Sequence, residues 1–355
     1  MALAAGLRYG AMPLLVLSDA DVRKLLSYPD CVAAMRTALA GLAAGQASQP
    51  LRSMPRLAAA PGLMGLMPAY LAAGPPDPAG DAADSGPAAD DGAYGLKVIT
   101  INPGNVSRGL DAHQGAVLLF DGQTGEPRAL LNGAALTEIR TAAVSVLATD
   151  ALGRPGADTL AVIGTGWQAR AHILAFTQTR PLREIRVAGR TQARAADLAA
   201  DLRPQIDTDI TACASAQEAL ASADIIATVT TSPEPVVRRE WIQPGAHINA
   251  VGAYLATTRE LDGATVAAAA LFADSRESLE AESGDFLLAR AEGLVGADHL
   301  RAELGQVLTG AAPGRTSDDE ITVFESLGLA VEDLAAAQLV CRQAIATSTG
   351  QWVTL

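Results

Sequence analysis

Residues 159–175 read TLAVIGTGWQARAHILA, and this stretch decides the fold. Four apolar residues at 160–163 predict a buried strand, and the alanine-rich amphipathic run after the glycines predicts a helix. Strand, glycine turn and helix form the first unit of a dinucleotide-binding fold. Gly164 permits the tight turn, Gly166 lets the backbone approach a pyrophosphate, and Ala169 stands where a third glycine usually lies.

The rest of the chain decides between this interpretation and a glycine turn in another kind of α/β protein. Further strands are predicted at 184–188, 208–212, 224–229, 247–251 and 270–273, with helices between several of them. Alternating strands and helices imply a mostly parallel sheet. We therefore predict an α/β protein with a doubly wound Rossmann sheet that binds a nucleotide.

The segments outside that sheet predict a second, α+β domain. Strands are expected at 14–17, 63–67, 94–102, 115–120 and 127–131, and the triplet at 52–54 also alternates as a strand would. Residues 322–346 are expected to form a long helix outside the Rossmann sheet that returns to pack on this domain. Residues 72–92 contain only small, turn-forming and acidic residues, so we expect a flexible surface insertion without chemistry.

Composition limits the class of protein. The chain has 355 residues, 49% of them hydrophobic, which is enough for two cores. Its formal charge of -13 argues against nucleic acid and anionic membranes as partners and favours a small molecule. Three widely spaced cysteines, Cys31, Cys213 and Cys341, fit free thiols in a reducing cytoplasm.

Two absences in the sequence sharpen these expectations. The four histidines, His113, His172, His247 and His299, show no ligand spacing, so we expect no metal. No apolar run is long enough to span a membrane, and the apolar residues at 12–17 are too few for a signal peptide. We expect a cytoplasmic protein without a membrane partner.

Eleven blocks carry a resemblance to a known family. They are PLRSMPRL (50–57), GLMPAY (65–70), YGLKVITINPGN (94–105), HQGAVLLFDGQTGEPRALLNG (113–133), LTEIRTAA (136–143), VIGTGWQARAH (162–172), PGAHINAVGA (244–253), RELD (259–262), AESGDF (281–286), AELGQVLTG (302–310) and GRTSDDEITVFESLGLAVEDLAAA (314–337). The chain resembles the ornithine cyclodeaminase/mu-crystallin family, in particular its ketimine reductase-like branch. The resemblance implies a Rossmann domain at 136–317 and a substrate and dimerisation domain at 1–135 with 318–355. It also implies a homodimer.

Three cations stand in the matching blocks of this acidic protein. The resemblance assigns Arg52 and Arg140 as ligands of a substrate carboxylate and Lys97 as the active-site lysine. Met67 is also expected to bind substrate. Arginine suits a carboxylate because it offers two parallel N–H groups. The alternatives are a solvated loop residue for Arg52 and an ordinary helix-face charge for Arg140. Lys97 is notable by itself, because a lysine in an apolar strand is costly unless it is paired or used.

The resemblance and the Rossmann pattern together indicate the cofactor site. The expected cofactor-binding residues are Thr137, Gly164, Thr165, Gly166, Trp167, Gln168, Ala169, Arg190, Thr191, Arg194, Thr228, Thr230, Val251 and Gly252. An NAD site usually has an acid at the end of the second strand, where this chain has Arg190 and Thr191. Arginine and a hydroxyl suit the 2′-phosphate of NADP, which we therefore expect as the preferred cofactor. NAD is the alternative, with Arg190 stacked on adenine.

One residue departs from the deaminating members of the family. Those members have an aspartate after the glycine pair of a block that reads Gly252-Ala253-Tyr254 here. Tyrosine is a poor base at neutral pH, and we expect Tyr254 to be a pocket wall or a weak proton donor among the catalytic residues. We therefore expect an NAD(P)H-dependent reductase of an α-imino acid or cyclic ketimine carboxylate. The alternatives are an ornithine or lysine cyclodeaminase, an alanine-type dehydrogenase, and a non-catalytic carboxylate-binding protein of the crystallin type.

Overall fold

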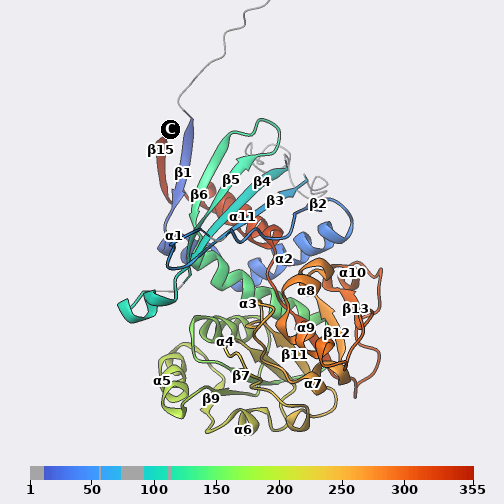
Figure 1. The fold of residues 1–355 in the computed structure, drawn as a ribbon. Helices are drawn as coiled ribbons and strands as arrows, with labels where there is room; N and C mark the ends of the chain where they lie inside the picture. The colour runs from blue at the N-terminus through green and yellow to red at the C-terminus, as the bar shows by residue number, and fades with distance from the viewer. Residues whose placement is uncertain (1–11, 56, 73–91, 111–112) are drawn as a thin grey trace, which may run out of the picture.

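The computed structural model describes residues 12–55, 57–72, 92–110 and 113–355. The expected insertion at 72–92 lies outside these residues apart from its two ends. Two sheets organise the described chain, and Figure 1 shows them as an upper and a lower layer with helix α3 between them.

The lower sheet is the Rossmann sheet that the glycine stretch predicts. Its eight strands are all parallel, so the predicted fold class is confirmed. In sheet order they are β13 (Leu300–Glu303), β12 (Ala270–Ala273), β14 (Thr322–Glu325), β11 (His247–Ala250), β10 (Ile225–Thr228), β7 (Thr159–Ile163), β8 (Glu184–Ala188) and β9 (Asp209–Ala212). The strand β7 is buried at every position, as a central parallel strand must be.

The upper sheet has seven strands and joins both ends of the described chain. In sheet order they are β15 (Gln351–Thr354), β1 (Pro13–Leu17), β6 (Pro127–Asn132), β5 (His113–Asp121), β4 (Ala93–Ile101), β3 (Leu63–Leu71) and β2 (Ala47–Ser48). Strand β15 pairs with β1, so blue and red segments lie side by side in Figure 1. The expected strand at 52–54 is reduced to one bridge between Ser53 and Leu66.

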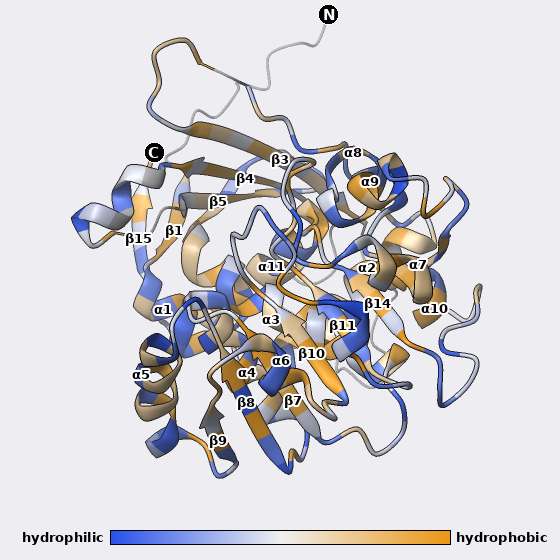
Figure 2. Ribbon diagram, turned by 60° about the horizontal axis from the view of Figure 1, so that its bottom comes forward, coloured by the Kyte–Doolittle hydropathy of each residue, from blue (hydrophilic) through white to orange (hydrophobic). Residues whose placement is uncertain are grey.

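Helices cover both sheets. They are α1 (Asp19–Leu25), α2 (Tyr28–Ala43), α3 (Gly133–Leu152), α4 (Trp167–Thr179), α5 (Gln192–Leu202), α6 (Ala216–Leu220), α7 (Gly263–Ala268), α8 (Arg276–Glu282), α9 (Gly284–Ala291), α10 (Leu304–Leu308) and α11 (Ala330–Ala346), with short 3-10 turns at Pro103–Arg108, Arg203–Gln205 and Arg239–Trp241. Asn132 begins α3 by accepting a hydrogen bond from the Ala135 amide at 2.9 Å. Nearly every residue of α3 is buried, because the helix packs on elements of both layers. Figure 2 shows orange, apolar segments in strands such as β7 and β10, whereas α5 at the surface is a mixture of tan and blue.

The expected helix over 322–346 was wrong at its beginning. Residues Thr322–Glu325 form β14, which lies between β11 and β12 in the Rossmann sheet, and the helix begins only at Ala330. Two β-branched residues and a phenylalanine favour the strand, and Gly328, at φ 80° in the left-handed region, lies in the turn between the strand and the helix. Strand β13 was also not predicted. In the part of the chain that the structure describes, no helix is long and apolar enough to cross a membrane.

Candidate functional site

A cavity of about 810 Å³ is lined by residues of both layers. Ten of the expected site residues line it, namely Arg52, Met67, Lys97, Thr137, Arg140, Gly166, Trp167, Gln168, Val251 and Tyr254. Apolar side chains such as Met54, Ile99 and Leu110 form much of the remaining wall. The residues that the sequence predicts for the substrate and some of those that it predicts for the cofactor therefore line one cavity.

The glycine turn stands at one end of this cavity. Gly164 has φ 139°, and a Cβ there would lie 2.7 Å from the Val229 carbonyl oxygen, so only glycine fits. Gly166 is the N-cap of α4, has no side-chain cap and has no atom within 4 Å of the position a Cβ would take. Gly166, Trp167 and Gln168 line the cavity, so the N-terminus of this 13-residue helix borders it, which suits a pyrophosphate.

Gln168 adds a second sign that this end of the cavity fits a nucleotide cofactor. Its Oε1 atom is buried and has no hydrogen-bond partner among the described residues, although Gln168 lines the cavity. A buried acceptor without a donor is unfavourable, and an amide or hydroxyl of a bound dinucleotide would supply the donor. The residues present thus fit the group that the Rossmann unit implies.

The remaining expected cofactor residues do not line the cavity. They are Gly164, Thr165, Ala169, Arg190, Thr191, Arg194, Thr228, Thr230 and Gly252. Arg190 and Thr191 are exposed just after β8, and the Thr191 side chain accepts a bond from the Arg194 amide at the start of α5. Ala169 is fully buried in α4, which is the close packing expected of a small residue there.

A buried glutamate joins two of the expected cofactor strands. Glu260 accepts bonds from the Thr230 amide at 2.5 Å and the Gly252 amide at 2.7 Å. Its carboxylate therefore fixes the turns after β10 and β11, where Thr230, Val251 and Gly252 stand. Burial is the largest influence on its pKa and raises it, against the effect of these hydrogen bonds.

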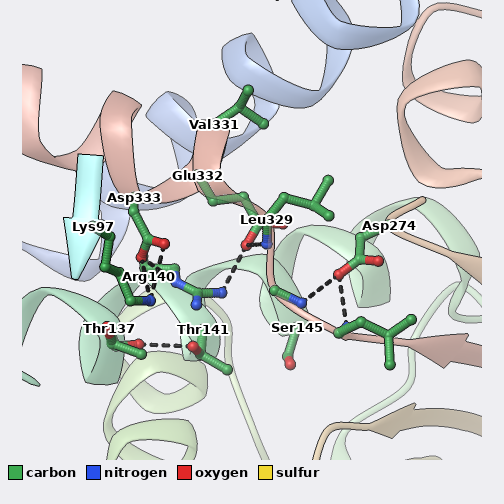
Figure 3. A network of polar contacts seen from close by, with 12 residues as sticks. Lys97, Thr137, Arg140, Thr141, Ser145, Asp274, Leu329, Val331, Glu332 and Asp333 are labelled. Atoms are coloured by element: carbon green, nitrogen blue, oxygen red, sulfur yellow. Dashed lines mark hydrogen bonds and ion pairs between the residues drawn. The ribbon is translucent and has the colours of Figure 1, made fainter. Parts of the chain in front are cut away.

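The end of the cavity where the sequence predicts the substrate is built on one carboxylate of α11. Asp333 accepts bonds from Lys97 Nζ at 3.0 and 2.9 Å and from Arg140 Nε at 3.0 Å. Arg140 Nη1 also donates to Glu332 at 2.7 Å. Figure 3 shows Lys97 on its strand, Arg140 on α3 and both acids on α11 converging. The side chains of Lys97 and Arg140 are only 3% and 5% exposed, so the acids compensate two buried charges.

These contacts set the proton affinity of the two cations differently. Burial lowers the pKa of Lys97 to about 8, although Asp333 opposes the effect. For Arg140, burial acts in the same direction, but Asp333 and Glu332 outweigh it and raise the pKa. Arg140 therefore stays charged, whereas Lys97 changes its charge in the neutral to mildly alkaline range.

The loop before α11 is held against the guanidinium of Arg140. Asp274 accepts bonds from the amides of Leu327 and Gly328 at 2.7 and 2.6 Å, as Figure 3 shows. A Cβ at Gly328 would lie 2.9 Å from two nitrogens of Arg140. Gly328 is therefore required both by its φ and by the close approach of Arg140.

Arg52, which lies between β2 and β3 of the upper sheet, lines the cavity and contacts an acid of the Rossmann layer. Its Nε and Nη2 lie 3.0 and 2.7 Å from Oε2 of Glu282, and Nη2 also donates to the Leu327 carbonyl. Tyr254 lines the same wall, and burial raises the pKa of its hydroxyl while Arg52 opposes that effect. The three expected substrate cations thus each hold an acid of this chain.

Comparison with known proteins agrees with this architecture. The profile of the ornithine cyclodeaminase/mu-crystallin family matches residues 83–348. The chain belongs to the ornithine cyclodeaminase/mu-crystallin family. The family assigned from the sequence blocks is therefore confirmed.

Individual members of this family resemble the chain over most of its length. Ketimine reductase mu-crystallin of Mus musculus is 40% identical over 296 residues, covering 83% of this chain and 85% of that protein. The structure of Thermococcus litoralis Δ1-pyrroline-2-carboxylate reductase in complex with NADH and L-proline has a TM-score of 0.87 at 34% identity, covering 96% and 100% of the two chains. An archaeal alanine dehydrogenase dimer with bound NAD has a TM-score of 0.86 at 28% identity, covering 96% and 99%.

Four acids around the cavity of this chain were not predicted from the sequence, namely Asp274, Glu282, Glu332 and Asp333. A signal for two of them was present, because Glu332 and Asp333 are adjacent charges inside the otherwise apolar run LGLAVEDLAAA at 327–337. Paired acids on the buried face of a helix require cations opposite them. Glu282 lies in the quoted block AESGDF, but neither its neighbours nor those of Asp274 indicate a partner for the side chain.

Proposed function

We propose that this chain is an NAD(P)H-dependent reductase that converts an α-imino acid or a cyclic ketimine carboxylate to an α-amino acid. One observation carries the proposal: three cationic side chains and the open N-terminus of α4 line the same cavity. The cations suit a carboxylate, and the helix end suits a dinucleotide pyrophosphate. The names of the similar reductases support the same chemistry.

In this mechanism the chain binds the carboxylate and excludes water. Within the described chain, the hydrogen bonds of Arg140 use Nε and Nη1, so Nη2 remains for the substrate. Lys97 gives two of its three N–H groups to Asp333 and keeps one. A nicotinamide cofactor held at the glycine turn and the N-terminus of α4 would supply a hydride for the imine carbon. The apolar wall around Met54 and Ile99 keeps water from the reacting carbon.

The proposal includes a preference for NADP, supported by the exposed Arg190 and Thr191 beyond β8. It also includes a homodimer, as in the archaeal alanine dehydrogenase, and a cytoplasmic location. The three cysteines are buried and unpaired, as is usual for a reducing compartment. The expected domain division at residues 135 and 317 is part of the same proposal.

The test is a screen of cyclic and acyclic imino acids with NADPH and NADH, in which turnover is measured as the loss of the absorbance of the reduced nicotinamide. We expect turnover of at least one cyclic ketimine carboxylate and slower or no release of ammonia from ornithine and lysine. Ammonia release as fast as the best imine reduction would favour the cyclodeaminase alternative. Tight binding of an imino acid without any turnover would favour the crystallin-type binding protein.

A further inference from the structure

Glu282 is the last residue of α8 and lines the cavity from the Rossmann layer. Figure 1 shows α8 on the side of the Rossmann layer that faces the upper sheet. The side chain of Glu282 is 17% exposed, and its Oε2 lies 2.7 Å from Nη2 of Arg52. An acid thus stands directly beside one of the cations that the proposed function assigns to the substrate carboxylate.

A second carboxylate of the cavity wall is engaged elsewhere. Glu138 lines the cavity, but its Oε2 accepts a bond from Arg23 at 2.7 Å. Asp333 and Glu332 are 1% and 0% exposed and are held by Lys97 and Arg140. Of these four acids, Glu282 alone both lines the cavity and contacts a substrate cation.

The substrate of the proposed reaction needs such an acid. A protonated imine carboxylate is a zwitterion whose positive nitrogen lies next to the carbon that carries the carboxylate. The nitrogen is two bonds from the carboxylate carbon, so a carboxylate held by Arg52 brings the nitrogen towards the Glu282 side chain that contacts Arg52. Tyr254 stands where deaminating members have an acid, and its hydroxyl is neutral because burial raises its pKa. Glu282 therefore supplies a negative charge that Tyr254 does not.

We propose that Glu282 is a catalytic residue that accepts a hydrogen bond from the protonated imine nitrogen. This inference rests on the proposed function. When the imine carbon accepts the hydride with its two electrons, a C–H bond forms and the π pair of the C=N bond moves to nitrogen. The iminium becomes a neutral amine that keeps its N–H, and the nicotinamide is oxidised. Glu282 selects a cationic C=N group over the neutral C=O group of a 2-oxo acid.

The test compares Glu282→Gln with Glu280→Gln, an exposed acid on the same helix. With Δ1-pyrroline-2-carboxylate and NADPH at neutral pH, we expect Glu282→Gln to lower kcat about 100-fold, because the bound imine then loses its proton more readily and the neutral C=N bond accepts hydride slowly. Glu280→Gln should keep the wild-type values. The amide keeps the shape and loses the charge, so a role limited to holding Arg52 predicts a changed KM with kcat kept, and that result would overturn the proposal.

A second variant keeps the test decisive if Glu282→Gln does not fold, which melting temperature and NADPH binding would reveal. Glu282→Asp retains the charge but withdraws it by one methylene, so we expect a kcat loss of about tenfold with KM unchanged. An unchanged kcat in that variant would also overturn the role. A wild-type enzyme that reduces no imino acid would instead overturn the proposed function. An active wild type whose kcat is matched by Glu282→Gln would overturn only the role of Glu282.

Discussion

The carboxylate of Asp333 lies 3.0 and 2.9 Å from the Nζ atom of Lys97, across 236 positions of sequence. Both groups are almost fully buried, and Asp333 also accepts a bond from Arg140. The contact joins strand β4 of the upper sheet to helix α11. It therefore controls both the position and the charge of a lysine that lines the cavity.

The first prediction concerns the pH dependence of activity. Lys97 must be protonated to donate to the substrate, so kcat/KM should fall as the pH rises through its pKa of about 8. Asp333 raises that pKa, so Asp333→Asn should move the alkaline limb to lower pH. The measurement is the pH profile of kcat/KM with a fixed imino acid and saturating NADPH.

The same variant should lose stability, because removal of one partner leaves Lys97 buried without a counter-charge. We expect a decrease of about 3–5 kcal/mol in the free energy of unfolding, measured with urea. Asp197→Asn on α5 is the control, since that side chain is exposed. An alkaline limb at the same pH in Asp333→Asn and wild type would refute the electrostatic coupling.

The second prediction concerns cofactor choice. Arg190→Asp should raise KM for NADPH about tenfold or more and spare NADH, because an acid repels the 2′-phosphate and suits ribose hydroxyls. The control is Arg183→Gln, which alters an exposed arginine just before the other end of the same strand. Equal preference for the two cofactors in wild type and variant would remove the case for NADP.

The third prediction concerns stability and pH. Burial raises the pKa of Glu325 well above its usual range, and Asp285 adds to the effect. Its folded-state pKa thus exceeds the unfolded one, so the folded state binds the proton more tightly. The contribution of Glu325 to the free energy of unfolding is fully present below its pKa in the unfolded state. It is lost as the pH rises through its pKa in the folded state.

Glu325→Gln should therefore make stability less dependent on pH. We expect a gain of about 1–3 kcal/mol in the free energy of unfolding at pH 7 and a smaller gain at pH 5. Glu320→Gln is the control with the opposite expectation. Arg301 and Thr316 lower the pKa of Glu320 despite its partial burial, so removing this charge should lower the free energy of unfolding. Urea unfolding at several pH values measures both, and a Glu325→Gln variant with the wild-type slope would contradict the assignment.

The sequence predicted what depends on local pattern. The apolar run at 160–163 and the glycines after it are adjacent, so β7, the turn and α4 follow from nearest neighbours. Strand β14 was missed because its four residues are too short to show a period before the helix begins. The Lys97–Asp333 and Arg52–Glu282 contacts join distant positions across two layers, and single-sequence periodicity carries no information about such pairs.

The last prediction separates the reaction types through Tyr254. Burial raises the pKa of its hydroxyl further above neutral pH, so we expect that it cannot replace the aspartate that the family resemblance gives to deaminating members. Wild type should therefore reduce imines and convert ornithine or lysine slowly or not at all. Tyr254→Phe should change kcat less than about threefold if the ring is only a wall, and about 100-fold if the hydroxyl donates a proton. Tyr254→Asp should gain ammonia release from ornithine. The control is Arg140→Ala, which should be inactive in both reactions because the buried acids Glu332 and Asp333 lose their counter-charge. Ammonia release by wild type at the rate of its best imine reduction would show that the tyrosine does not exclude deamination.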